Sequence, residues 1–102
     1  MNKIPVTTPY FGKEEETAAC EAIKSGWVAQ GPKVGEFEKK IAEHENVREG
    51  VAVTSCTAAL HLAMVASGMC EGMDVLAPAF TFVATTNAIV CTGAVPILVD
   101  ID

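Results

Sequence analysis

Positive charge is missing from half of this sequence, because residues 51–102 contain no lysine or arginine. All seven basic residues lie in the first fifty positions, and the chain has a net charge of −6 at pH 7. Nucleic acids and anionic membranes are bound through concentrated Lys and Arg, so neither is an expected partner. The second half reads as interior, with buried strands and helices, since its only charges are four acids: Glu71, Asp74, Asp100 and Asp102.

Metal-site and secretion signals are also absent. The cysteines lack the CxxC spacing of zinc sites, and the sequence MNKIPVTTPYFGKEEE lacks the apolar core of a signal peptide. We therefore expect no metal site and a cytoplasmic location. Apolar or small residues surround all four cysteines, which predicts reduced, buried thiols at Cys20, Cys56, Cys70 and Cys91.

The first fifty residues predict an extended lead-in followed by two helices. Prolines keep residues 1–12 out of regular structure, and a run of three glutamates before an apolar stripe predicts a helix over residues 13–24. A loop bounded by glycines and proline follows at residues 26–32. The second helix is indicated by apolar residues at helical spacing, namely Val34, Phe37 and Ile41.

Strands and helices alternate in the second half, which predicts an α/β fold. N-terminal helices would be followed by β-α-β-α-β of a mostly parallel sheet. We expect residues 1–50 to form the lead-in and helices, and residues 51–102 to begin a larger, incomplete domain. The expected elements are strands at 51–54, 75–77 and 95–101 and helices at 58–67 and 81–91.

The turn at residues 54–58 is the strongest candidate for chemistry. It stands where a strand gives way to a helix, so free backbone N–H groups, the positive end of the helix dipole and hydroxyls converge there. Such a turn can bind phosphate. The alternative is that Ser55 or Thr57 only caps the helix.

Several motifs in order along essentially the whole chain resemble the DegT/StrS type of pyridoxal-phosphate (PLP) sugar aminotransferase. The resemblance implies a fold type I aminotransferase, of which this would be part of the large domain, and a homodimer with active sites at the subunit interface. It also implies PLP as cofactor. The matching stretches are SGW at 25–27, QGPK at 30–33, VTSCTAALH at 53–61, Gly72, Asp74, Pro78, TFVAT at 81–85, and NA at 87–88.

Carried over by position, the resemblance implies a cofactor site in the second half. Thr57 and Ala58 would meet the cofactor phosphate, Ser55 and Cys56 would shape the turn, and Phe82 would stack on the pyridine ring. The alternative for Phe82 is a place in the core, as we expect for Phe80 two positions earlier.

The glycine-bounded loop resembles the loop that lies near the substrate opening in this family. The resemblance therefore makes Trp27 and Gln30 candidate substrate-binding residues, although Trp27 could equally anchor the first helix by packing. His61, within the expected helix at 58–67, is interpreted as a hydrogen-bonded core histidine.

No lysine in the sequence suits the covalent aldimine that a transaminase needs. All lysines lie in the polar first half, namely Lys3, Lys13, Lys24, Lys33, Lys39 and Lys40. We therefore assign no catalytic residue, and we expect the aldimine lysine to lie beyond the chain end. The family places the acid that pairs with the pyridine nitrogen in a later strand, so Asp100 and Asp102 do not take that role. The sequence is thus expected to be a truncated product or fragment.

The leading hypothesis is an N-terminal fragment of a PLP-dependent nucleotide-sugar aminotransferase, inactive alone. The resemblance implies amino-group transfer, from glutamate as the expected donor, to a keto-sugar, with sugar-nucleotide and amino-acid substrates as partners. Two alternatives stay open: a non-catalytic module that binds another phosphate ligand through the turn, and a regulatory or interaction fragment.

Overall fold

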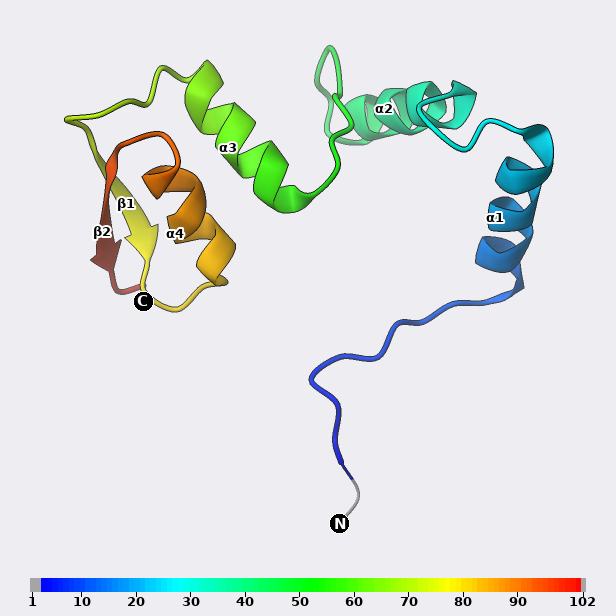
Figure 1. The fold of residues 1–102 in the computed structure, drawn as a ribbon, viewed down its shortest axis with the longest axis horizontal. Helices are drawn as coiled ribbons and strands as arrows, with labels where there is room; N and C mark the ends of the chain where they lie inside the picture. Colours follow the sequence, from blue (N-terminus) through cyan, green and yellow to red (C-terminus); the bar gives the residue numbers. More distant parts are fainter. Residues whose placement is uncertain (1–2, 102) are drawn as a thin grey trace. The chain divides into compact units, whose positions relative to one another are not determined.

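The computed structural model describes residues 3–101, and it divides into two compact units, Met1–Ala52 and Val53–Asp102 (Figure 1). The first unit holds two helices, and the second holds two helices and two strands. In chain order the elements are α1 (Lys13–Ser25), α2 (Pro32–His44), α3 (Cys56–Ala66), β1 (Asp74–Pro78), α4 (Val83–Val90) and β2 (Val95–Val99).

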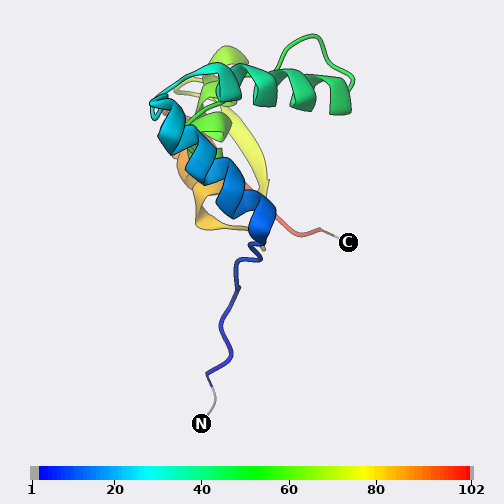
Figure 2. The same cartoon turned by 90° about the vertical axis from the view of Figure 1, so that its right-hand side faces the viewer.

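Helix α1, the blue helix in Figure 2, forms where the sequence predicted it. It lies between Gly12 and Gly26. At its start the carboxylate of Glu15 accepts a hydrogen bond from the backbone N–H of Gly12 at 2.7 Å. This bond holds the pKa of Glu15 below its ordinary value of 4.5. The helix ends at Gly26, which takes the left-handed conformation with φ of 77° that a residue with a Cβ adopts only with strain.

Helix α2 also matches its prediction and starts with Pro32 in the first turn, where a missing N–H costs nothing. After α2 the chain turns back along the helix. The N–H of Val47 donates to the carbonyl of Ala42 at 3.0 Å, and the N–H of Ala52 donates to the Glu38 carboxylate at 2.8 Å. A Cβ on Gly50 would lie 2.7 Å from the Glu38 carbonyl oxygen, so only glycine allows this close approach.

The strand predicted at residues 51–54 is wrong. Within the described residues, no other segment pairs with it as a β-strand, and Ala52 N–H bonds to a side chain instead. A β-branched run becomes a strand only when a neighbour takes up its backbone hydrogen bonds. The predicted α/β fold class is nevertheless confirmed, because β1 and β2 form a parallel pair of strands.

In the second unit, β1 and β2 pair in parallel, and α4 makes the crossover between them (Figure 1). The register runs from Asp74 opposite Val95 to Pro78 opposite Val99. Helix α4 packs on both strands and on α3. A small core lies between them, formed by Ala77, Ile89 and Ala94 with the partly buried Met64 and Val75 around it.

Most apolar side chains of the second half are exposed, so its interpretation as buried interior is wrong for the described residues. Only one large side chain, Ile89, is fully buried among them. The four thiols predicted to be buried, Cys20, Cys56, Cys70 and Cys91, are all exposed. The physical reason is that two strands and two helices bury only one face of each element, whatever the apolar content of the rest.

Candidate functional site

The turn at the start of α3 is built around Ser55. This residue is extended, with φ of −163° and ψ of 160°, and its hydroxyl oxygen accepts from the N–H of Ala58 at 3.1 Å. Its carbonyl oxygen accepts from the N–H of Ala59 at 3.0 Å, which is the first intrahelical bond. Ser55 therefore caps the helix, as the capping interpretation of this turn predicted.

Capping leaves donors free at the same turn. Within residues 3–101, neither the N–H of Cys56 nor that of Thr57 has a hydrogen-bond partner, and both residues are exposed. The first turn of α3 contains no acidic residue. Two free N–H groups, a hydroxyl on Thr57 and an unopposed helix dipole fit a phosphate group. The cap and the anion site are thus compatible.

Phe82 stands at the start of α4, after the carboxyl end of β1. It is the residue before the first helical turn, and its carbonyl accepts from the N–H of Thr85 at 3.0 Å. Helices α3 and α4 pack together and run in the same general direction in Figure 1, so both N-termini face the carboxyl-end side of the strands. Open parallel α/β sheets bind ligands on that side.

Burial does not separate the two phenylalanines of this segment. Phe82 is 76% exposed and Phe80 is 94% exposed. The prediction that Phe80 belongs to the core is wrong, because the segment 79–82 leaves β1 as an open bend with nothing among residues 3–101 packed over it. A ligand could therefore reach the ring of Phe82. Phe82 differs from Phe80 because it lies directly before the first turn of α4.

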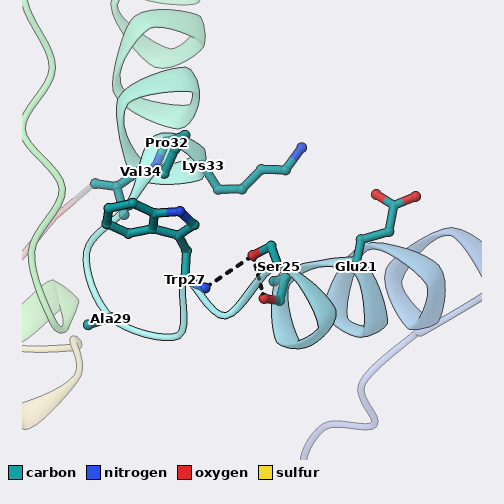
Figure 3. Close-up of a pocket in the computed structure, with 9 residues that line it drawn as sticks. Glu21, Ser25, Trp27, Ala29, Pro32, Lys33 and Val34 are labelled. Atoms are coloured by element: carbon teal, nitrogen blue, oxygen red, sulfur yellow. Dashed lines mark hydrogen bonds between the residues drawn. The ribbon is translucent and has the colours of Figure 1, made fainter.

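The loop between α1 and α2 borders a cavity of about 240 Å³ (Figure 3). Trp27, predicted as a substrate-binding residue, forms part of its wall and is 63% exposed, whereas Gln30 is not among the lining residues. The cavity is lined by Glu21, Ala22, Ser25, Trp27, Ala29, Gly31, Pro32, Lys33 and Val34.

Sequence reasoning passed over two residues that hold this loop. Ser25 accepts a hydrogen bond from the N–H of Trp27 at 3.1 Å, and Gly31 lies against the indole. The serine–glycine pair at the end of α1 could have predicted the bond between Ser25 and Trp27, because serine often bonds to the backbone where a helix ends. His61 is half-buried in α3 and its ring makes no hydrogen bond in the described part of the chain, so its interpretation as a hydrogen-bonded core histidine is wrong.

Neither a metal cluster nor a membrane-length helix occurs in the described part of the chain. No group of three or more His, Cys, Asp or Glu side chains within residues 3–101 is arranged to hold a metal ion. No helix in the same range has the length and apolar content needed to cross a bilayer.

Comparison with known proteins gives one consistent result. The model of the DegT/DnrJ/EryC1/StrS aminotransferase family matches residues 9–102. The chain is 46% identical over 99 residues to the spore coat polysaccharide biosynthesis protein SpsC of Bacillus subtilis, covering 97% of this chain and 25% of that protein.

Solved structures agree with the family match. The candidate sugar aminotransferase Spr1654 of Streptococcus pneumoniae, in its PLP form, superposes with a TM-score of 0.88 at 33% identity, covering 99% of this chain and 26% of that one. The aminotransferase TlmJ of Streptoalloteichus hindustanus gives a TM-score of 0.85 at 38% identity, covering 99% and 28%.

The chain spans about a quarter of the length of these relatives. SpsC is named for polysaccharide biosynthesis, and Spr1654 and TlmJ are named as aminotransferases. The Spr1654 structure is of the PLP form. The family model extends over almost all of the chain, including the turn at α3, the start of α4 and the loop before α2. The chain belongs to the DegT/DnrJ/EryC1/StrS aminotransferase family.

Proposed function

We propose that this chain is the N-terminal, cofactor-phosphate-binding part of a PLP-dependent aminotransferase that transfers an amino group from glutamate to a nucleotide-linked keto-sugar. The family match over residues 9–102 carries this proposal. The superposition on a PLP-form structure and the free donors at the start of α3 support it. Residues 1–50 would form the lead-in and substrate-side loop, and residues 51–102 the start of the PLP-binding domain.

In this proposal the residues of the turn bind and orient the cofactor. The free N–H and hydroxyl of Thr57 and the first turn around Ala58 hold the phosphate, while Ser55 and Cys56 fix the shape of the turn. Phe82 would contact the pyridine ring and limit its movement. When bound, PLP supplies an electron sink for the reacting carbon.

The residue that binds the cofactor covalently lies, in this proposal, outside these 102 residues. The lysines whose side chains form contacts are in exposed pairs on helices, such as Lys13 with Glu16 and Lys39 with Glu43. A catalytic lysine nucleophile is activated by desolvation in an apolar pocket or by a neighbouring cationic group, and these exposed lysines lie beside glutamates instead. We also propose a cytoplasmic homodimer with active sites completed across the subunit interface, as the resemblance in sequence implies.

Ser55 allows a test that separates phosphate binding from helix capping. Asp and Asn cap helices about as well as Ser, so Ser55→Asp and Ser55→Asn should both keep α3 stable to within about 0.5 kcal/mol. Only Asp adds a negative charge beside the phosphate. The host is a chimera in which this chain replaces the stretch of Spr1654 that it matches, and the readout is PLP retained after dialysis, measured by absorbance.

We expect the Ser55→Asp chimera to lose most of its PLP and the Ser55→Asn chimera to retain it. Ser67 just after the last turn of α3 is the matched control, because its hydroxyl bonds to the Ala63 carbonyl at the opposite end of the helix. Ser67→Asp should retain PLP. Equal PLP retention by the two Ser55 variants would show that the turn only caps α3 and would favour a non-catalytic role for this segment.

A further inference from the structure

Glu38 carries an inference that rests on the proposed function and deepens it. We propose that Glu38 is a positioning residue for the cofactor-phosphate turn at residues 54–58. Its carboxylate holds the backbone of Ala52, the last residue of the first unit, and only two residues separate Ala52 from Ser55. Glu38 would thus affect phosphate binding without contacting the phosphate.

The bond between Ala52 and Glu38 joins residues that are far apart in the sequence. The N–H of Ala52 donates to Oε1 of Glu38 at 2.8 Å, across 14 positions of the chain. Both residues are half-buried, whereas the residues on either side of each in the sequence are exposed. A hydrogen bond to a carboxylate is stronger than a neutral one, and partial burial strengthens it further. The bond therefore fixes the backbone where the chain leaves the first unit.

Glu38 takes the place of a neighbouring strand for the segment at residues 51–54. Within the described residues no strand pairs with this segment, so the backbone N–H of Ala52 finds its partner on a side chain. A binding site that is ordered before its ligand arrives loses less entropy when the ligand binds. The bond to Glu38 supplies such order directly before the turn that begins α3.

Gly50 allows the close approach on which this bond depends. A Cβ at this position would lie 2.7 Å from the carbonyl oxygen of Glu38. That oxygen belongs to the backbone of α2, so it cannot move aside as the end of a flexible side chain would. We therefore expect Gly50→Ala to push the returning chain away from α2. The bond to Ala52 would then break although the carboxylate is still present.

The other two glutamates of α2 make different contacts. Glu36 and Glu43 form exposed ion pairs with lysines of the same helix, at 3.4 and 3.9 Å. In the part of the chain that the structure describes, neither carboxylate accepts a hydrogen bond from a backbone N–H. Exposed ion pairs contribute little to stability. Glu43→Ala is therefore the matched control, because it removes the same charged group from the same helix without affecting Ala52.

Pyridoxal, which is PLP without its phosphate, separates positioning of the turn from general stability. We would free the Spr1654 chimera of cofactor, titrate it with PLP and with pyridoxal, and follow the absorbance of each. Glu38→Ala should weaken PLP binding about tenfold and pyridoxal binding by no more than about twofold, because only PLP uses the turn. Glu38→Gln keeps an acceptor oxygen, so it should bind PLP within about threefold of the parent chimera.

Two further variants and a second readout complete the test. Gly50→Ala should reproduce the Glu38→Ala result, and Glu43→Ala should bind PLP and pyridoxal like the parent, with helix content checked by circular dichroism. Amide hydrogen exchange in the 102-residue chain measures the bond itself. The N–H of Ala52 should exchange about tenfold faster in Glu38→Ala and at the parent rate in Glu43→Ala.

Three results would overturn the inference and leave the proposed function standing. The first is a Glu38→Ala chimera that keeps the parent's preference for PLP over pyridoxal. The second is a Glu38→Gln chimera that binds PLP as weakly as Glu38→Ala, and the third is exchange at Ala52 that Glu38→Ala does not change. A parent chimera that binds PLP no better than pyridoxal would instead contradict the proposed function, because the turn would then not bind phosphate.

Discussion

Two phenylalanines that follow β1 show that the burial of a side chain cannot be predicted from its sequence motif. From the sequence, Phe80 was expected in the core and Phe82 at the cofactor; the structure exposes both. A core role depends on which elements cover a residue, and no local pattern contains that information. The assignment of Phe82 depends on the family motif at 81–85 and remains a prediction.

Replacing the two phenylalanines separately tests that assignment. In the Spr1654 chimera, Phe82→Ala should speed the loss of PLP during dialysis, because the ring face that confines the pyridine is gone. Phe80→Ala should leave PLP retention unchanged. If both variants lost PLP equally, with equal falls in melting temperature, Phe82 would be no more than a packing residue.

At the scale of helices and strands, local signals predicted most elements. Each helix signal lies within one or two turns of the helix end that it predicts. These signals are the three glutamates at the start of α1, the proline at the start of α2 and the glycine near the end of α3, and the helices form there. The strand at 51–54 failed because its formation depends on a pairing partner far along the chain. The cavity beside Trp27 could not be predicted, since it requires two helices and a loop to meet.

Helix α1 should respond to pH through its first turn. The bond from the Gly12 N–H lowers the pKa of Glu15 in the folded state. A lowered pKa means that the contribution to helix stability is complete above the ordinary value of 4.5 and is lost as the pH falls through the folded value. We therefore expect α1 to fray only on the acidic side of pH 4.5.

The amide proton of Gly12, followed by NMR, measures this change. Its chemical shift should titrate at acidic pH in the parent chain and stay flat in Glu15→Gln, where no carboxylate forms. Glu14→Gln is the control, since Glu14 makes no hydrogen bond to this turn within the described residues, and it should leave the Gly12 titration in place. Persistence of the titration in Glu15→Gln would disprove the assignment.

For the whole molecule, the exposed apolar surface of the second unit is the dominant feature. Helix α4 covers the sheet face that carries Val75 and Ala77, while Leu76 and Ile97, opposite each other in the register, lie on the other face. Both strands also have free edges in the described part of the chain. Surfaces of this kind drive association.

We expect the isolated 102-residue chain to self-associate and to unfold without a sharp transition. Sedimentation velocity and thermal unfolding measure both properties. Leu76→Gln should shift the distribution toward monomer because it adds a polar group to the open sheet face. Val6→Gln, a change at another exposed apolar residue outside the sheet, should not. A stable monomer with cooperative unfolding would contradict the expectation.

Borohydride reduction followed by peptide mass spectrometry decides whether these residues bind the phosphate of PLP while the covalent lysine lies elsewhere. The measurement compares the 102-residue chain with the Spr1654 chimera, each incubated with PLP and reduced. We predict no specific pyridoxyl-lysine in the chain alone and about one per subunit in the chimera, on a lysine contributed by Spr1654. A specific adduct on a lysine of this chain, or a folded chimera that forms no adduct at all, would contradict this division of roles.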